Sequence, residues 1–191
     1  MLEALTHLFA AVCGQNPAHT WALGGMVLPC CQRCTGLYVG ACVAAALHVC
    51  LRPKPTGRFL EMHGLFLLLM LPFGLHWLPQ GPAIRAVTGV LFGFAVVTFL
   101  WLPLHSALAN RPFTRRTKSL GTPVYSLAVV LTLGLLPMLG TWDARPAACL
   151  LAGLALTGAT ALGGLVVANI GWALAEAFRL FCRLAQGRTQ P

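Results

Sequence analysis

Residues 86–104 read AVTGVLFGFAVVTFLWLPL, a stretch that contains no charged side chain. A helix needs roughly 20 mostly apolar residues to cross the hydrocarbon core of a bilayer, so this stretch predicts a transmembrane helix. The whole chain has the same character, because 58% of its 191 residues are hydrophobic and only 9% are charged. Soluble domains carry about 25% charged residues, so the composition predicts a protein whose solvent is lipid.

Four further apolar stretches of similar length flank this one. In lipid every backbone amide must be hydrogen-bonded within the protein, and helices achieve this. We therefore expect an all-α, polytopic transmembrane bundle. Its five spans are predicted at residues 35–51, 60–78, 86–104, 122–142 and 147–170. Continuation of the last helix to Phe178 would require a tilt or an interfacial end.

Positively charged residues gather at one end of the predicted spans. Ten of the 13 Lys and Arg residues follow the first, third and fifth spans. Arg33, Arg85 and Arg145 fall at the other end. Because cytoplasmic loops are rich in Lys and Arg, the pattern predicts an N-terminus outside the cytoplasm and a C-terminus inside it. The ten are Arg52, Lys54, Arg58, Arg111, Arg115, Arg116, Lys118, Arg179, Arg183 and Arg188.

This orientation divides the chain into three parts. We expect an extracytoplasmic, cysteine-containing N-terminal segment at 1–34, a five-helix transmembrane domain at 35–178 and a basic cytoplasmic tail at 179–191. The first twelve residues contain Glu3 but no Lys or Arg, so a secretory signal with a basic start is not expected. The predicted location is the inner (cytoplasmic) membrane, as a multi-pass protein in contact with the lipid bilayer.

The formal net charge of +9 does not indicate nucleic-acid binding. Proteins that bind phosphate backbones gather their cations in one patch or stripe. Here short basic runs separate apolar stretches, which is the pattern of membrane topology. Nucleic acid is therefore not expected as a partner.

Two predicted spans begin with the same small-residue pattern. Thr35-Gly36-x-x-x-Gly40 opens the first span and Thr88-Gly89-x-x-x-Gly93 opens the third. Such small-x-x-x-small pairs let transmembrane helices approach closely, so we expect these two spans to pack together. Spans two and four share a Leu-Pro pair followed by Trp, and a duplicated two-helix hairpin is therefore a further hypothesis.

The stretch Pro29-Cys30-Cys31-Gln32-Arg33-Cys34-Thr35-Gly36 places a Cys-x-x-Cys pair at the outer start of the first span. Its spacing puts the sulfurs of Cys31 and Cys34 on one side of the first helical turn, and Cys13 lies upstream on the same side. A helix N-terminus carries about half a positive charge, and Arg33 adds a full one. Both favour the thiolate, the form that binds metals and attacks disulfides.

The cysteines leave several kinds of chemistry open. One is a site for a transition metal such as zinc or iron, with Cys13, Cys31, Cys34 and His19 as candidate ligands. Another is a structural disulfide, which is common outside the cytoplasm. A third is a membrane thiol–disulfide oxidoreductase in which Cys31 and Cys34 are catalytic, with an extracytoplasmic protein partner and, in a quinone-linked form, a quinone. Inert buried thiols are the fourth interpretation.

Arg33 and Arg85 each stand at the outer start of a predicted span, where a cation is disfavoured by the helix dipole. We therefore expect them to form a pocket that stabilises a bound anion or the thiolates. A small-solute transporter is the least favoured function, because transport predicts polar or ionisable groups at mid-membrane and the spans contain few.

Three motifs resemble the signature of a bacterial and archaeal family of predicted membrane proteins with a domain of unknown function. They are Cys13-x-Gln15-x-Pro17, then Pro29-x-Cys31-x-Arg33-Cys34-Thr35-Gly36-x-Tyr38-x-Gly40, then Leu78-Pro79-Gln80-Gly81 with Arg85-x-x-Thr88-Gly89. The resemblance implies a membrane location and a shared cysteine-rich face, and it implies no activity. It covers about residues 13–93, so the last two spans depend on hydropathy alone.

The chain departs from the family signature at four positions. Gly14 stands where the family has a His after the first Cys, which removes one obvious metal ligand. Cys30 is an extra thiol beside Cys31, His19 occupies a position that is usually basic, and His76 replaces an Asp. His19 or Cys30 could take the place of the missing ligand.

Overall fold

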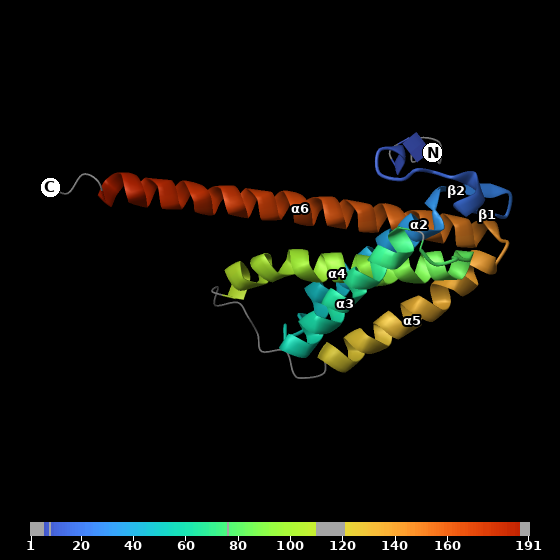
Figure 1. The fold of residues 1–191 in the computed structure, drawn as a ribbon, viewed down its shortest axis with the longest axis horizontal. Helices are drawn as coiled ribbons and strands as arrows, with labels where there is room; N and C mark the ends of the chain where they lie inside the picture. The colour runs from blue at the N-terminus through green and yellow to red at the C-terminus, as the bar shows by residue number, and fades with distance from the viewer. Residues whose placement is uncertain (1–5, 8, 76, 110–120, 188–191) are drawn as a thin grey trace.

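The computed structural model describes residues 6–7, 9–75, 77–109 and 121–187 (Figure 1). Helices α2, α4 and α6 begin at one end of the bundle, and α3 and α5 end there. The predicted all-α membrane bundle is therefore confirmed, with a short β-hairpin added at that end. The helices of the described part are α2 (Gln32–Leu51), α3 (Gly57–Gly74), α4 (Pro82–Ala109), α5 (Gly121–Thr141) and α6 (Arg145–Gly187).

Four of these five helices are long and apolar enough to cross a membrane: α2, α4, α5 and α6, judged on the described residues. Helix α3 has 18 residues and carries Arg58 and Glu61 near its start. These charges lower its hydropathy, so the predicted second span is a helix that does not meet the same criterion. That prediction also included His76, which lies outside the described residues.

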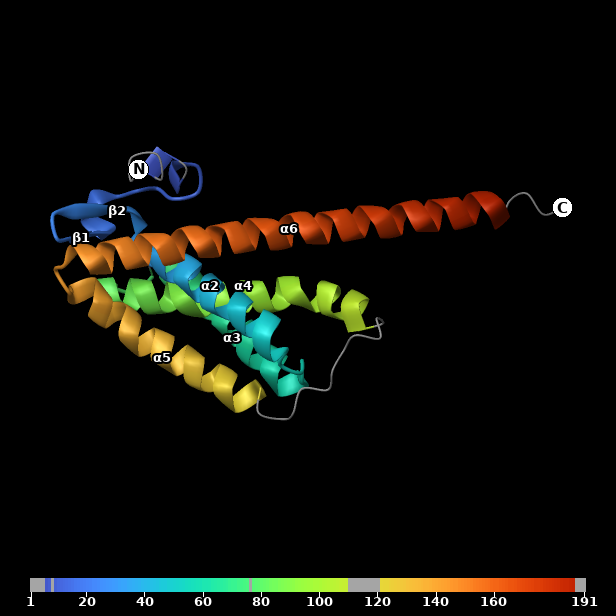
Figure 2. The same ribbon diagram turned by 180° about the vertical axis from the view of Figure 1, so that it is seen from behind.

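Helix α6 extends much further than the sequence indicated. It contains 43 residues, which at 1.5 Å per residue is about 64 Å. The hydrocarbon core of a bilayer is about 30 Å thick. The helix continues past the predicted end of its span at Ile170 and past Phe178, and its C-terminal part projects beyond the other helices (Figures 1 and 2).

The packing of α2 against α4 is built on the two glycine pairs that the sequence singled out. A Cβ atom on any of these glycines would collide with the backbone of the other helix, so the two main chains are in direct contact. The predicted close approach of the first and third spans is thus confirmed. The contacts are reciprocal: Gly36 faces Ala86, Gly89 faces Arg33, Gly40 faces Val90 and Gly93 faces Leu37.

The β-hairpin consists of β1 (Thr20–Leu23) and β2 (Met26–Cys31), which pair antiparallel. Gly24 and Gly25 form its turn with φ angles of 55° and 75°, the positive values that two-residue hairpin turns favour. The Asp143 carboxylate accepts a hydrogen bond from the Gly24 N–H, and Arg145 Nε donates to the Gly24 carbonyl at 3.3 Å. The turn is therefore fixed to the start of α6.

A chain of buried hydrogen bonds joins four helices toward the other end of the bundle. His48 Nε2 lies 3.0 Å from Thr98 Oγ1, which lies 3.2 Å from the Tyr125 hydroxyl, which in turn lies 2.9 Å from His63 Nε2. His63 Nδ1 donates to the Phe59 carbonyl at 2.7 Å, so its Nε2 accepts the Tyr125 proton. The four side chains are at most 4% exposed, and unsatisfied polar groups would cost several kcal/mol at membrane depth.

We predict that Gly93→Ala destabilises the bundle by roughly 1–3 kcal/mol, because the added methyl group overpacks a contact that has no free space. A Cβ atom at this position would meet the Leu37 carbonyl and the Ala41 nitrogen. Thermal unfolding of the purified protein in detergent measures the effect.

Gly134→Ala provides the matched control, since nothing lies within 4 Å of a Cβ atom built there. This change removes a helical glycine without creating a collision, and it should leave the unfolding temperature unchanged or raise it. Equal effects of the two substitutions would contradict the packing described here.

Candidate metal centre

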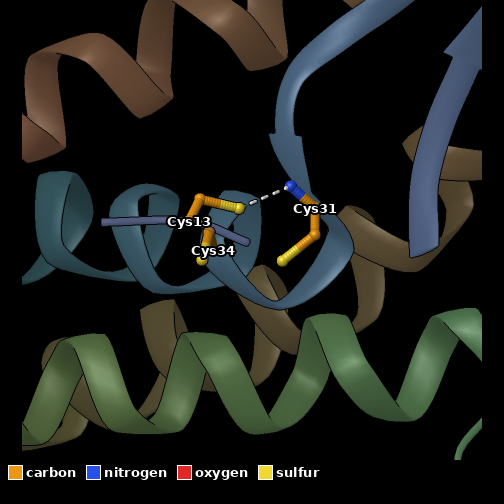
Figure 3. Close-up of side chains that lie close together, drawn as sticks. All are labelled: Cys13, Cys31 and Cys34. Atoms are coloured by element: carbon orange, nitrogen blue, oxygen red, sulfur yellow. Dashed lines mark hydrogen bonds between the residues drawn. The ribbon is translucent and has the colours of Figure 1, made fainter. Parts of the chain in front are cut away.

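Three cysteines meet at the hairpin end of the bundle. The sulfurs of Cys13, Cys31 and Cys34 all lie within 4.8 Å of one another. Cys31 is the last residue of β2 and the N-cap of α2, and Cys34 lies in the first turn of that helix. The close-up in Figure 3 shows Cys13 reaching the pair from a separate segment. The structure thus brings together three of the four predicted metal ligands.

Cys13 is held in place by its neighbours in the N-terminal segment. Its own sulfur accepts a hydrogen bond from the Cys31 N–H at 3.3 Å. The Gln15 side-chain amide donates to the carbonyls of Thr6 and Pro29, at 2.5 and 3.1 Å. Gln15 has a φ of 44°, in the left-handed region that non-glycine residues rarely adopt, and the two side-chain hydrogen bonds stabilise it there. Cys13 itself is only 4% exposed.

Cys30 does not join the sulfur cluster, although it adjoins Cys31. Successive side chains of a strand point to opposite faces, and the Cys30 sulfur lies 3.4 Å from the Thr35 hydroxyl instead. Burial raises the pKa of Cys30 to about 12, so this thiol stays protonated at neutral pH. The extra thiol of this chain is therefore a buried core residue that lies outside the sulfur cluster formed by the described residues.

His19 lies beside the sulfurs without reaching them. It lines the same cavity of about 260 Å³ as Cys13, Cys31 and Cys34. In the described part of the chain, the group whose ligand atoms lie within 4.8 Å of one another contains no His19 nitrogen. The structure therefore leaves His19 on the cavity wall, where the sequence proposed it as the fourth ligand.

Arg33 and Arg85 line this cavity from α2 and α4. Arg33 Nη2 donates to the Phe73 carbonyl at 2.8 Å and also to the Gln80 side chain. Gln80 donates to the same Phe73 carbonyl at 2.5 Å, so the end of α3 fixes the Arg33 guanidinium. The Nε atoms of both arginines are buried and have no hydrogen-bond partner in the described structure.

The Cys31 thiol is the most acidic group of the cluster. A hydrogen bond from the Cys34 thiol lowers the pKa of Cys31 to about 5, against the opposing effect of burial. Further hydrogen bonds from the backbone of Cys34 and Arg33 and from the Cys13 thiol act in the same direction. Cys31 is therefore a thiolate at neutral pH, the form that binds soft metals and attacks disulfides.

Several residues that shape this end of the molecule or the core were not among the predicted site residues. Gln80 belongs to the Leu78-Pro79-Gln80-Gly81 motif, but that motif did not indicate that Gln80 accepts a hydrogen bond from Arg33. Thr98 and Tyr125 complete the buried histidine chain and were not singled out. Their signal was a polar side chain inside an otherwise apolar span, at the same depth as His48 and His63.

Comparison with known proteins supports the resemblance seen in the motifs. Residues 13–99 match the family described as "Predicted membrane protein (DUF2085)". The predicted family resemblance is thus confirmed for this stretch, which contains the three cysteines, both cavity arginines and the glycine pairs of α2 and α4. Helices α5 and α6 lie outside the match. No curated protein and no solved structure matches the chain.

We predict that iodoacetamide alkylates Cys31 of the reduced, metal-free protein almost as fast at pH 6 as at pH 8. A thiol with a pKa of about 5 is roughly nine-tenths thiolate at pH 6, whereas an ordinary thiol is less than about 1% ionised there. Because the pKa is lowered, the reactivity is lost only as the pH falls through about 5. Mass spectrometry of the peptides gives the rate at each cysteine.

Exposed Cys50 serves as the comparison within the same sample. Cys34→Ala removes the hydrogen bond that contributes most to the low pKa, so the Cys31 rate at pH 6 should fall about tenfold or more in that variant. If the Cys31 rate rose steeply from pH 6 to pH 8 in parallel with that of Cys50, the assignment of Cys31 as the acidic thiol would be wrong.

Proposed function

We propose that Cys13, Cys31 and Cys34 bind one soft transition-metal ion, with zinc as the first candidate and iron as the second. The observation that carries this proposal is the mutual approach of the three sulfurs within 4.8 Å. Tetrahedral zinc takes sulfur at about 2.3 Å, which places neighbouring sulfurs about 3.8 Å apart. Small rotations about the Cα–Cβ bonds close the remaining gap.

The charges around the cluster favour the same function. Metal ions bind thiolates, and Cys31 is already ionised at neutral pH. Arg33 and Arg85 on the cavity wall compensate the negative charge that three thiolates would bring. None of the described residues that line the cavity is acidic, so hard, oxygen-preferring ions such as Mg²⁺ and Ca²⁺ find no carboxylate ligand there.

We further propose that the cluster lies on the extracytoplasmic face of the inner membrane. The segment at 1–34 would be outside and the tail at 179–191 inside, with the transmembrane domain between them. The distribution of Lys and Arg supports this orientation. Helices α2, α4 and α6 all begin at the end of the bundle that carries the cysteines. This is consistent with a chain whose successive helices cross the membrane in alternating directions.

A thiol–disulfide oxidoreductase is the second candidate, and the low pKa of Cys31 favours it. In that reaction Cys31 attacks the disulfide of an extracytoplasmic partner and Cys34 resolves the mixed disulfide. The partner gains two electrons and two protons, and a Cys31–Cys34 disulfide forms. Before the pair can reduce another partner disulfide, a two-electron donor must reduce the Cys31–Cys34 disulfide. If the protein instead oxidises its partner, a quinone must reoxidise the Cys31–Cys34 dithiol and is itself reduced to a quinol.

We expect the protein, purified in detergent with its cysteines reduced, to bind one equivalent of zinc through the three cysteines. Cys31→Ser and Cys13→Ser should each weaken binding at least about 100-fold, since even the loss of an outer partner of a ligand lowers metal affinity 10–100-fold. Competition with a chromophoric chelator measures the affinity, and elemental analysis gives the stoichiometry.

Cys149→Ser is the matched control, because Cys149 is exposed on α6 and outside the cluster. Zinc binding that is unchanged in Cys31→Ser would contradict the proposed metal site. A protein that binds no metal and has two fewer free thiols, recovered by mild reductant, would instead support the redox pair or a structural disulfide.

A membrane-impermeant maleimide should label Cys31 of metal-free protein in bacterial cells whose outer membrane has been permeabilised, and should leave Cys182 unlabelled. Cys182 lies near the end of α6, on the side proposed to be cytoplasmic. Disruption of the inner membrane should then expose Cys182 as well. Labelling in the opposite order would refute the proposed orientation.

A further inference from the structure

The cavity beside the sulfurs has room for a small ligand. It measures about 260 Å³, and polar side chains of Gln15, Asn16 and His19 line it together with the two arginines and the three cysteines. Its volume far exceeds the share of one water molecule, about 30 Å³. A small molecule of several atoms therefore fits next to the sulfurs.

The described residues supply three clustered ligands where a tetrahedral ion needs four. Structural zinc sites are closed by four protein ligands, whereas sites that act on a ligand keep one position open. Cys30 turns toward Thr35 and His19 stays outside the cluster. The fourth position of an ion bound to Cys13, Cys31 and Cys34 therefore faces the cavity.

With a divalent ion bound to three thiolates, the cavity would carry a net positive charge, which favours an anionic ligand. Three thiolates and a divalent ion carry one net negative charge, and the guanidinium groups of Arg33 and Arg85 carry two positive ones. Among the described residues that line the cavity, none carries a carboxylate. A single negative charge on the incoming ligand would make the site neutral.

Both arginines have a hydrogen-bond donor to spare. The Nε atoms of Arg33 and Arg85 are buried and unpartnered in the described structure, and a buried donor without a partner costs about 1–3 kcal/mol. Arg33 is held by the Phe73 carbonyl and Gln80, so its guanidinium is positioned before any ligand arrives. Both arginines line the cavity, and an anionic oxygen or nitrogen there would accept strong, charge-assisted hydrogen bonds from a guanidinium group.

We propose that the metal centre is an open site whose fourth ligand is a small monoanion, such as a carboxylate, held by Arg33 and Arg85. The inference rests on the proposed metal binding by Cys13, Cys31 and Cys34. It adds the class of ligand and gives a role to the two arginines. The anion exchanges with solvent while the three sulfurs retain the ion.

Cobalt provides the test, because thiolate-bound Co²⁺ has visible absorption bands that respond to its fourth ligand. Full-length protein in detergent is loaded with one equivalent of Co²⁺ and titrated with sodium azide, and separately with sodium acetate, at constant ionic strength. We expect a saturable change in the cobalt bands with each anion. Arg85→Gln should weaken azide binding about tenfold or more while the cobalt stays bound.

Two further variants make the outcome decisive. Arg85→Lys keeps the charge and should recover part of the azide affinity. Arg58→Gln alters an exposed arginine at the start of α3 and should leave the azide affinity unchanged. If neither anion changes the cobalt bands, the proposal of an open site is wrong, while the proposal of metal binding still stands. Anion binding that is insensitive to Arg33→Gln and Arg85→Gln would overturn the role of the arginines, and absence of bound cobalt would end both proposals.

Discussion

The direct contact between the backbones of α2 and α4 is the constraint on which the rest of the structure depends. In lipid there is no hydrophobic driving force for helices to associate, so close van der Waals packing has to hold them together. Gly36, Gly40, Gly89 and Gly93 allow this approach, and the other helices pack around the resulting pair. The same contact brings the starts of α2 and α4 together, which is why Arg33 and an arginine 52 positions later line one cavity.

The two ends of the bundle use polar groups in different ways. Toward one end, His48, Thr98, Tyr125 and His63 satisfy one another in a closed chain that terminates on a carbonyl. At the end with the hairpin, sulfurs and guanidinium groups face a cavity, and two donors are left over. A buried hydrogen-bonded network fixes the positions of the helices, whereas a cavity lined by polar and charged side chains suits a site for a ligand.

Contacts that a recognisable local pattern signals could be predicted from the sequence, and other contacts between distant segments could not. Glycines at four-residue spacing have a restricted use in an apolar helix, so the packing of the first and third spans was predictable. The pairing of Cys31 with Cys34 followed from helical geometry. By contrast, the exclusion of Cys30 depends on β2, whose hairpin is anchored to Asp143, 119 residues from Gly24. The great length of α6 was not predicted, because Arg179 and Arg183, which were expected in a tail after the span, lie within the same continuous helix.

The sulfur cluster takes its members from two pieces of chain with different attachments. Cys31 and Cys34 belong to the helix that is locked to α4, while Cys13 is carried by a short arm outside the bundle (Figure 3). That arm is fastened by the two hydrogen bonds of Gln15 and by the contact of Phe9 with the Tyr38 ring, 5.1 Å between centroids. Of the three sulfurs in the proposed metal site, that of Cys13 therefore depends on the N-terminal segment for its position, whereas the other two depend on the start of α2.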